Sequence, residues 1–280
     1  MSKKHYPCVL TIAGSDCSGG AGIQADIKTI SALGAYAASA ITAVTVQNTC
    51  GVTDVYPVPA HTVAAQIEAV MSDLYPDSVK IGMVNDADVV RAIAQTISRF
   101  HPRHVVFDPV MISSSGRKLM SDEAIEIIRT ELFPLCTLIT PNLNEASFLL
   151  NRPVHSTTDM EAAARHLLCH GSQAVLLKGG HLNGTQMDDV LQKKDTLHTY
   201  LYSAPKVETT NTHGTGCTLS AAIATFLALG SSLEEAVRQA KDYVHQCLET
   251  GKDIWAGHGH GSMNHLHHPV PMHILGGEKQ

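Results

Sequence analysis

The feature that most constrains the fold is a regular alternation of short apolar runs with longer amphipathic segments. The apolar runs predict buried strands, and apolar residues at a helical period predict helices. Strands separated by helices are typical of a mainly parallel sheet covered on both faces. We predict strands at residues 9–13, 38–46, 79–83, 105–108, 138–140 and 174–178, and helices at 23–33, 61–74, 89–100, 123–132, 145–150, 160–170, 218–229 and 233–248.

The alternation breaks once, between residues 188 and 205, where the helical period disappears and antiparallel strands at a sheet edge are expected. We find no internal repeat and no low-complexity linker. A chain of 280 residues that is 44% hydrophobic is long enough for one large α/β domain. We therefore predict a single domain over residues 1–280.

Composition excludes several classes of function. The formal net charge is -6 and only 16% of the residues are charged, so the basic field that nucleic acid requires is missing. No apolar stretch approaches the roughly 20 residues that span a bilayer. The seven cysteines are odd in number and show no CxxC spacing, which is typical of a reduced, cytoplasmic protein. We expect neither nucleic acid nor a membrane as a partner.

A glycine-containing heptapeptide, Asn-Thr-His-Gly-Thr-Gly-Cys at 211–217, directly precedes a predicted Ala-rich helix. Gly214 and Gly216 allow a tight turn in which several backbone N–H groups point at one spot. Such a nest binds anions. The alternative is a glycine-rich helix start that binds nothing.

Polar residues follow several predicted strands, where the carboxyl edge of a parallel sheet forms ligand sites. Asp108 and Lys178 each end a strand, and Asn142 and Glu145 follow another. Oxygen ligands suit Mg²⁺, and a lysine can neutralise phosphates. From the residues alone, Asn142 with Glu145 is an equally good helix capping box, and Lys178 can be a solvated strand-end lysine.

Two further segments bear on the ligand. The glycine-rich residues 19–22 follow the first strand, but their spacing is not GxGxxG, which argues against hydride transfer with a dinucleotide. Gln47 offers one acceptor and one donor side by side, whereas the plainer interpretation is a polar residue that ends a strand.

Together these motifs carry a resemblance. The chain resembles the hydroxymethylpyrimidine/phosphomethylpyrimidine kinases of thiamine biosynthesis, which belong to the ribokinase-like superfamily. The resemblance implies a three-layer sandwich, a pyrimidine substrate, ATP, Mg²⁺ and a homodimer. It rests on Thr11-Ile-Ala-Gly-Ser-Asp16, Ser18-Gly-Gly-Ala-Gly-Ile-Gln-Ala-Asp26, Gln47-Asn-Thr-Cys-Gly-Val52, Lys80-Ile-Gly-Met83, Asp108-Pro-Val-Met111, Thr140-Pro-Asn-Leu-Asn-Glu145, Leu177-Lys-Gly-Gly-His181 and Asn211 to Cys217.

The resemblance also implies roles at the phosphate end. Cys217 stands where most of the superfamily has an aspartate base, and we expect its position at a helix N-terminus to lower the pKa of the thiol. The alternative is an inert buried thiol. The implied roles are transfer of the phosphate for Gly214, Gly216, Cys217 and Asp108, ATP binding for Lys178, Thr212 and Thr215, and metal binding for Asn142 and Glu145.

At the substrate end, the resemblance assigns Gly14, Asp16, Gln47, Met83 and Val110 to the pyrimidine pocket. A 4-aminopyrimidine presents an N–H donor beside a ring-nitrogen acceptor, which complements a glutamine amide. Met83 and Val110 would supply apolar walls for the flat ring, although core residues look the same in sequence.

Two alternatives remain open. Pyridoxal also presents a hydroxymethyl group on a flat ring, so a pyridoxal kinase is the second enzyme hypothesis. A vitamin-binding module without catalysis is the hypothesis from another class, and the intact phosphate motifs argue against it.

The histidines near the C-terminus can bind metal in principle, but they match no tetrahedral spacing and no cysteine joins them. Residues 257–261 instead resemble the family's glycine-rich C-terminal segment.

Overall fold

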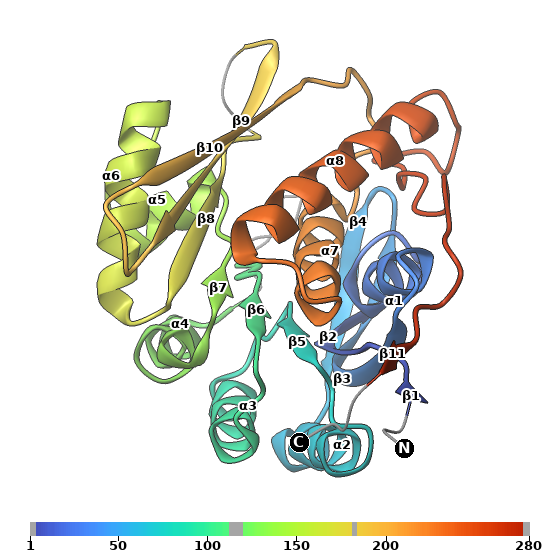
Figure 1. The fold of residues 1–280 in the computed structure, drawn as a ribbon, viewed down its shortest axis with the longest axis vertical. Coiled ribbons are helices and arrows are strands. Elements are labelled where there is room, and N and C mark those ends of the chain that lie inside the picture. The colour runs from blue at the N-terminus through green and yellow to red at the C-terminus, as the bar shows by residue number, and fades with distance from the viewer. Residues whose placement is uncertain (1–3, 112–119, 181–183, 277–280) are drawn as a thin grey trace.

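The computed structural model describes residues 4–111, 120–180 and 184–276, and in it a nine-stranded sheet lies between two layers of helices (Figure 1). The strand order is β10-β9-β8-β7-β6-β5-β2-β3-β4. Neighbouring strands are parallel from β8 to β3, and β4, β9 and β10 are antiparallel to their neighbours at the two edges. The predicted ribokinase-like, mainly parallel α/β sandwich is confirmed.

The strands of the sheet are β2 (Cys8–Asp16), β3 (Tyr36–Asn48), β4 (Gly51–Pro57), β5 (Ser78–Ile81), β6 (Val105–Phe107), β7 (Leu138–Ile139), β8 (Ala174–Lys178), β9 (Gln186–Lys193) and β10 (Thr199–Pro205). A separate two-stranded sheet pairs β1 (Lys4–His5) with β11 (Leu275–Gly276). The helices are α1 (Gly22–Ala32), α2 (Ala60–Asp73), α3 (Ala87–Phe100), α4 (Asp122–Ile127), α5 (Leu143–Leu150), α6 (Thr157–Leu167), α7 (Thr215–Ala228) and α8 (Leu233–Gly251).

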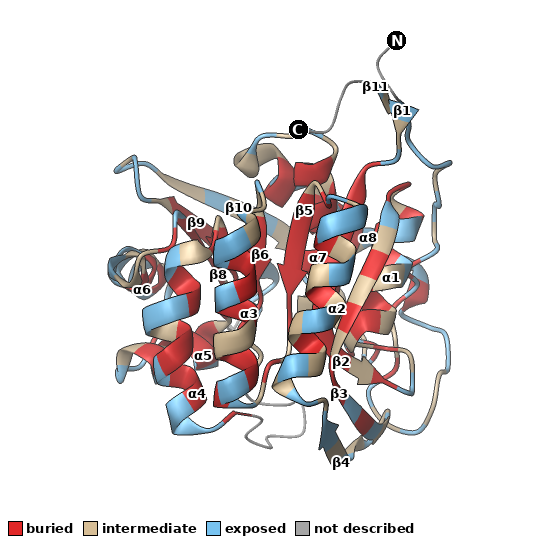
Figure 2. Cartoon of the chain, turned by 90° about the horizontal axis from the view of Figure 1, so that it is seen from below, coloured by how far each residue is buried: buried red, intermediate tan, exposed pale blue. Residues whose placement is uncertain are grey.

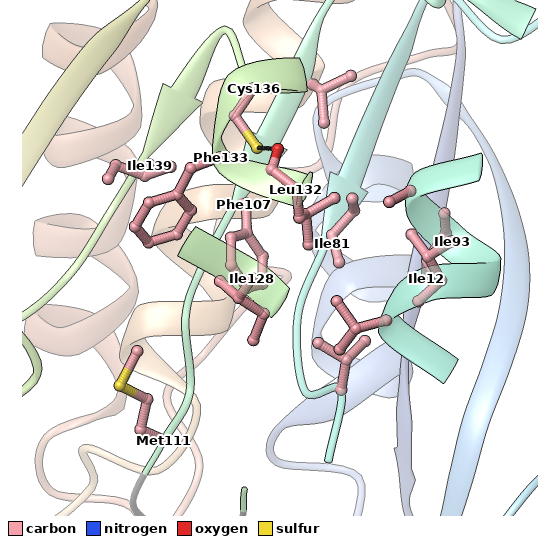
Figure 3. Packing of buried hydrophobic residues seen from close by; sticks show 14 of the residues in the cluster. Ile12, Ile81, Ile93, Phe107, Met111, Ile128, Leu132, Phe133, Cys136 and Ile139 are labelled. Carbon is pink, nitrogen blue, oxygen red and sulfur yellow. Dashed lines mark hydrogen bonds between the residues drawn. The ribbon is translucent and has the colours of Figure 1, made fainter. Parts of the chain in front are cut away.

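Alternation along the strands creates two cores, one on each face of the sheet. On β2, Leu10 and Ile12 pack into the core under α2 to α6, whereas Val9 packs into the core under α1, α7 and α8. Successive side chains of a strand point to opposite faces, so one apolar run serves both layers. In Figure 3, Phe107 and Phe133 lie within the first core, and Figure 2 shows that the buried residues of the helices face the sheet.

Several predicted boundaries need correction. The strand expected at 79–83 ends at Ile81, so Met83 lies in the following loop. The helix expected at 123–132 changes to a π-helical turn over Ile128–Leu132. Strand β4 was not predicted, because its side chains are mostly exposed and show no apolar alternation. The antiparallel pair predicted within 188–205 is confirmed as β9 and β10.

This topology brings the polar residues to one edge. The loops after β2, β5, β6 and β7 leave the same side of the parallel sheet, which is where open α/β sheets bind ligands. Among the described residues, no helix is sufficiently long and apolar to cross a bilayer.

Candidate active site

The centre of the site is the start of α7, which we call the phosphate loop and define as residues 211–217. Gly214 caps the helix with a φ of +80°, and a Cβ on it would collide with the carbonyl oxygen of Gly20. The loop therefore needs glycine here for both its conformation and its contact with the glycine-rich turn. The first-turn N–H groups of Gly216 and Cys217 have no acceptor within the helix, which makes them available to an anion.

A buried ion pair lies directly beneath this loop. Lys178 Nζ lies 2.6 Å from Asp108 Oδ1, which also accepts a hydrogen bond from Thr140 Oγ1 at 3.0 Å. A Cβ on Gly216 would lie 3.2 Å from both Lys178 Nζ and Asp108 Oδ2. Burial alone would lower the pKa of Lys178, but the carboxylates of Asp108 and Glu145 raise it, so this lysine remains a cation.

Asn142 and Glu145 form a complete capping box at the start of α5. The Asn142 side chain accepts from the Glu145 N–H at 2.9 Å, and the Glu145 carboxylate accepts from the Asn142 N–H at 2.7 Å. The structural interpretation left open by the sequence is thus realised. Both Asn142 Oδ1 and Glu145 Oε2 are already engaged by backbone donors, although each oxygen retains lone-pair capacity.

The charges around Glu145 nonetheless fit a hard cation. Burial raises its pKa to about 7, the nearby Asp108 carboxylate adds to the rise, and Lys178 opposes it. Two neighbouring carboxylates repel each other, so a divalent cation between them would be stabilised. Among the described residues, no group of three or more His, Cys, Asp or Glu side chains forms a ready-made metal site, and this applies equally to the described histidines of the tail.

The expected low pKa of Cys217 is wrong. Burial raises the pKa of the thiol to about 11, and the Lys80 cation only partly offsets this increase. The helix N-terminus does favour a thiolate, but the loss of water around the sulfur has the larger effect. Cys217 is therefore a neutral thiol at neutral pH.

Lys80 is a site residue that sequence reasoning missed. Its Nζ lies 2.8 Å from Asp26 Oδ2, which also accepts from Thr11 Oγ1 at 2.6 Å, and both charged side chains are fully buried. Two residues earlier on β5, Ser78 Oγ donates to Ala224 O of α7 at 2.6 Å, so Lys80 faces the same helical layer. A lysine between the apolar residues Val79 and Ile81 of a predicted buried strand was the available signal.

Asp16 organises the glycine-rich turn. Its carboxylate accepts hydrogen bonds from Ser18 N at 2.8 Å, Ser18 Oγ at 2.7 Å, Gly20 N at 3.1 Å and Ala21 N at 2.8 Å. Burial alone would raise the pKa of Asp16, but these donors together with His213 hold it well below its usual range. Asp16 is therefore a firmly ionised carboxylate with most of its acceptor capacity used inside the protein.

His213 connects the two ends of the site, and sequence reasoning had assigned it no role. Its Nε2 lies 2.9 Å from Asp16 Oδ2 and 3.2 Å from Nε2 of the Gln47 amide. Because an ionised carboxylate only accepts, His213 Nε2 carries the proton that points to Asp16. A glutamine amide nitrogen facing the same N–H would place two donors against each other.

A half-turn of the Gln47 amide resolves this conflict. Its oxygen then faces His213, and its nitrogen donates to Thr45 Oγ1, the atom 3.2 Å from the other end of the amide. Thr45 keeps its single proton for Ser15 O at 2.9 Å. We assign this orientation because it removes the contact between two donors and lets Asp16 and Gln47 share the single Nε2 proton of His213. A β-bulge between Val46 and Gln47 aims the side chain into the site.

The remaining predicted residues belong either to the substrate end or to the ATP end of the site. At the substrate end, Gly14 and Met83 are in contact, since a Cβ on Gly14 would lie 2.6 Å from Met83 Cε. Val110 is a partly exposed residue of the loop after Asp108. Thr212 is exposed, and its carbonyl oxygen accepts from Thr215 Oγ1 at 2.7 Å. The hydroxyl of Thr215 is therefore used within the loop.

Comparison with known proteins shows the family of the chain. The profile of the family described as phosphomethylpyrimidine kinase matches residues 16–264. The chain belongs to the phosphomethylpyrimidine kinase family. A hydroxymethylpyrimidine/phosphomethylpyrimidine kinase of Salmonella typhimurium is 49% identical over 260 residues, which cover 92% of this chain and 97% of that protein.

Solved structures of two named activities resemble the fold. A phosphomethylpyrimidine kinase from Clostridium difficile is 43% identical with a TM-score of 0.76, covering 86% of this chain and 99% of that one. A pyridoxal kinase from Bacillus subtilis, solved as an ADP complex, is 33% identical with a TM-score of 0.86, and the match covers 93% of this chain and 98% of that one. Sequence identity is therefore higher to the pyrimidine kinase, while backbone similarity is higher to the pyridoxal kinase.

Proposed function

We propose that this chain transfers the γ-phosphate of ATP to 4-amino-5-hydroxymethyl-2-methylpyrimidine, and then a second phosphate to the monophosphate product. The observation that carries the proposal is the position of Gly216 directly above the Asp108–Lys178 ion pair. Backbone donors and a buried cation then converge on one anion site, as stabilisation of a transferring phosphate requires. The close relatives named for this activity support the choice of substrate.

In the transfer, the hydroxymethyl oxygen forms a bond to the γ-phosphorus while the bond from that phosphorus to the bridging oxygen of ADP breaks. We assign Gly214 and Gly216 to the moving phosphate. Cys217 is a protonated thiol, so we assign it to hydrogen bonding of the attacking hydroxyl, whose proton leaves to water after the new bond forms. A loose transition state places little demand on a base.

ATP and Mg²⁺ complete the proposed phosphate end. Lys178 neutralises ATP phosphates, and Thr212 with Thr215 lines their approach. When bound, Mg²⁺ would neutralise the charge of the nucleotide phosphates. The Glu145 carboxylate and, through water, the Asn142 amide would hold it.

At the other end, Gln47 would recognise the pyrimidine. Its amide keeps one N–H and one oxygen lone pair beyond those used by Thr45 and His213, and these face the complementary edge of a 4-aminopyrimidine. We assign Gly14, Met83 and Val110 to the walls around the ring.

We further propose that residues 1–280 form one domain that works in the cytoplasm as a homodimer. Both cores share one sheet, which supports a single domain. Val44, Val46 and Tyr56 on the β3–β4 hairpin are 48%, 48% and 63% exposed, which suits a contact between two copies. Sedimentation velocity should give the mass of two chains, and a monomer at micromolar concentration would contradict the dimer.

The test is product formation by the purified protein with ATP and Mg²⁺, resolved by mass spectrometry. Mono- and diphosphorylated pyrimidine are expected. Pyridoxal is the second substrate to offer, because the chain superposes on a pyridoxal kinase with a TM-score of 0.86. Product from pyridoxal alone would replace the proposed substrate, and no product from either would contradict the kinase.

A further inference from the structure

The Gly-His-Gly-His-Gly run at residues 257–261, which we call the strap, has no part in the proposed chemistry. Figure 1 shows the chain leaving α8, in red, and running past α1 to β11. Just after α8, the strap lies against the turn between β3 and β4. His260 N donates to Thr49 O at 2.9 Å, and Gly259 N donates to Thr49 Oγ1 at 3.1 Å. The strap is thus bonded to the turn that follows Gln47.

The glycine spacing of the strap follows from these contacts. A Cβ on Gly257 would lie 2.5 Å from Thr49 Oγ1, and one on Gly259 would collide with the carbonyl oxygen of Thr49. A Cβ on Gly261 would collide with Asn211 Oδ1. Every second residue therefore packs flat against the protein, while the histidines between them, His258 and His260, are exposed. This packing accounts for the glycine at every second position of the strap.

The other end of the strap is bonded to the phosphate loop. His213 N donates to Gly261 O at 3.1 Å, and the buried Asn211 side chain donates to Gly251 O at 2.8 Å and to Ile254 O at 2.7 Å. The strap thereby links the β3–β4 turn to the phosphate loop. The β3–β4 hairpin and the phosphate loop also touch directly, through the Gln47–His213 contact at 3.2 Å.

We propose that the strap is a positioning segment that fixes the spacing between Gln47 and the phosphate loop, and that Thr49 is the positioning residue through which it acts on the pyrimidine. The inference rests on the proposed roles of Gln47 and the loop. Strand β4 is a sheet edge, and among the described strands it pairs with β3. Near the site, the Cys17 sulfur lies 3.1 Å from the backbone oxygen and 3.4 Å from the backbone nitrogen of Gln47, and the strap holds the turn that follows at Thr49. A strap that holds the hairpin keeps the hydroxymethyl group at attacking distance, where small displacements are costly.

The test compares two pairs of variants by steady-state kinetics. Gly259→Ala should raise the KM for the pyrimidine about tenfold, with little change in the KM for ATP, because one or two hydrogen bonds to the hairpin are lost. Gly276→Ala is the matched control, since a Cβ there meets nothing within 4 Å. Thr49→Val should show the same KM increase as Gly259→Ala, and Thr49→Ser, which keeps the acceptor oxygen, should restore the KM.

Wild-type KM in Gly259→Ala and Thr49→Val would overturn the inference, as would equal defects in Thr49→Val and Thr49→Ser. Hydrogen exchange gives a readout that does not depend on activity. The amides of residues 47–52 and 211–217 should exchange faster in Gly259→Ala than in Gly276→Ala, and equal rates would also overturn it. If the wild type phosphorylates nothing, the proposed function fails, while the exchange comparison still decides the role of the strap.

Discussion

The phosphate end and the pyrimidine end of the site are built differently. Asp108 and Lys178 follow or end central strands and are surrounded by core, and the phosphate loop offers backbone N–H groups. Gln47, by contrast, sits near the tip of an edge hairpin, and its side chain contacts Thr45 of the same strand and His213 of the phosphate loop. The proposed chemistry is thus assigned to strand ends surrounded by core and the proposed recognition to an edge hairpin, as binding loops on a scaffold usually are. Enzymes named for two different substrates share this fold, which agrees with that division.

The division predicts that the buried charges behind the phosphate loop cost most when disturbed. Lys80→Met leaves the buried Asp26 carboxyl without its cation, so that it must stay desolvated or take up a proton, and the variant should lower the free energy of unfolding by about 3–5 kcal/mol. Urea denaturation measures this. The double variant Asp26→Asn/Lys80→Met removes both charges and should recover most of the loss. A single variant as stable as the wild type would show that the pair does not support the site.

The phosphate loop should control turnover rather than substrate affinity. Gly214→Ala places a Cβ against Gly20 O at a φ of +80°, so the N–H groups of the loop are displaced. We expect kcat to fall about 100- to 1,000-fold, the usual effect of losing an oxyanion donor, while the KM for the pyrimidine changes little. Steady-state kinetics with Gly276→Ala as control decides it. A change confined to KM would reverse the assignment of the two ends.

The pyrimidine end should show the opposite pattern. Gln47→Ala removes a pair of neutral hydrogen bonds and should raise the KM for the pyrimidine about tenfold or more, with a smaller change in kcat. Gln246→Ala, on the exposed surface of α8, is the control. If Gln47→Ala lowered kcat as strongly as Gly214→Ala, recognition and chemistry would not be separable in this site.

The smallest predicted effect concerns the Cys217 thiol. Its pKa of about 11 predicts that iodoacetamide labelling of its peptide accelerates about tenfold per pH unit from pH 7 to 10 without a plateau. Because the folded state raises this pKa from 9.0, the free energy of unfolding should fall as the pH increases from 9 toward 11, relative to Cys217→Ser. The exposed Cys169 provides an internal reference for labelling. A plateau of the labelling rate near pH 7 would instead support the hypothesis that Cys217 is a thiolate that acts as a base.

Most of the fold could be predicted because its central strands are continuous apolar runs bounded by helices. Strand β4 was not predicted, because an exposed edge strand such as Gly51–Pro57 has no buried face that would require alternating apolar residues. The π-helical turn at Ile128 was not predicted either, because the spacing of apolar residues does not distinguish it from a continuing α-helix.

Sequence motifs could propose individual residues for the site. Properties that depend on tertiary contacts, such as the pKa or the partners of a side chain, could not be predicted in this way. The pKa of Cys217 depends on burial, which a helix position does not reveal. His213 lies inside a recognised motif, yet its partners Asp16 and Gln47 come from distant segments of the chain. The capping role of Asn142 could be read from local spacing and is present, while its metal role stays a prediction.

Competition between substrates tests the proposed function most directly. Equal concentrations of the hydroxymethylpyrimidine and pyridoxal, with ATP and Mg²⁺ in one reaction, give a product ratio that equals the ratio of the two kcat/KM values. We predict that pyrimidine phosphates dominate at every early time point, and that Gln47→Ala reduces this preference. A reaction that yields mainly pyridoxal phosphate would contradict the assignment of Gln47 to the pyrimidine and of the chain to its phosphorylation.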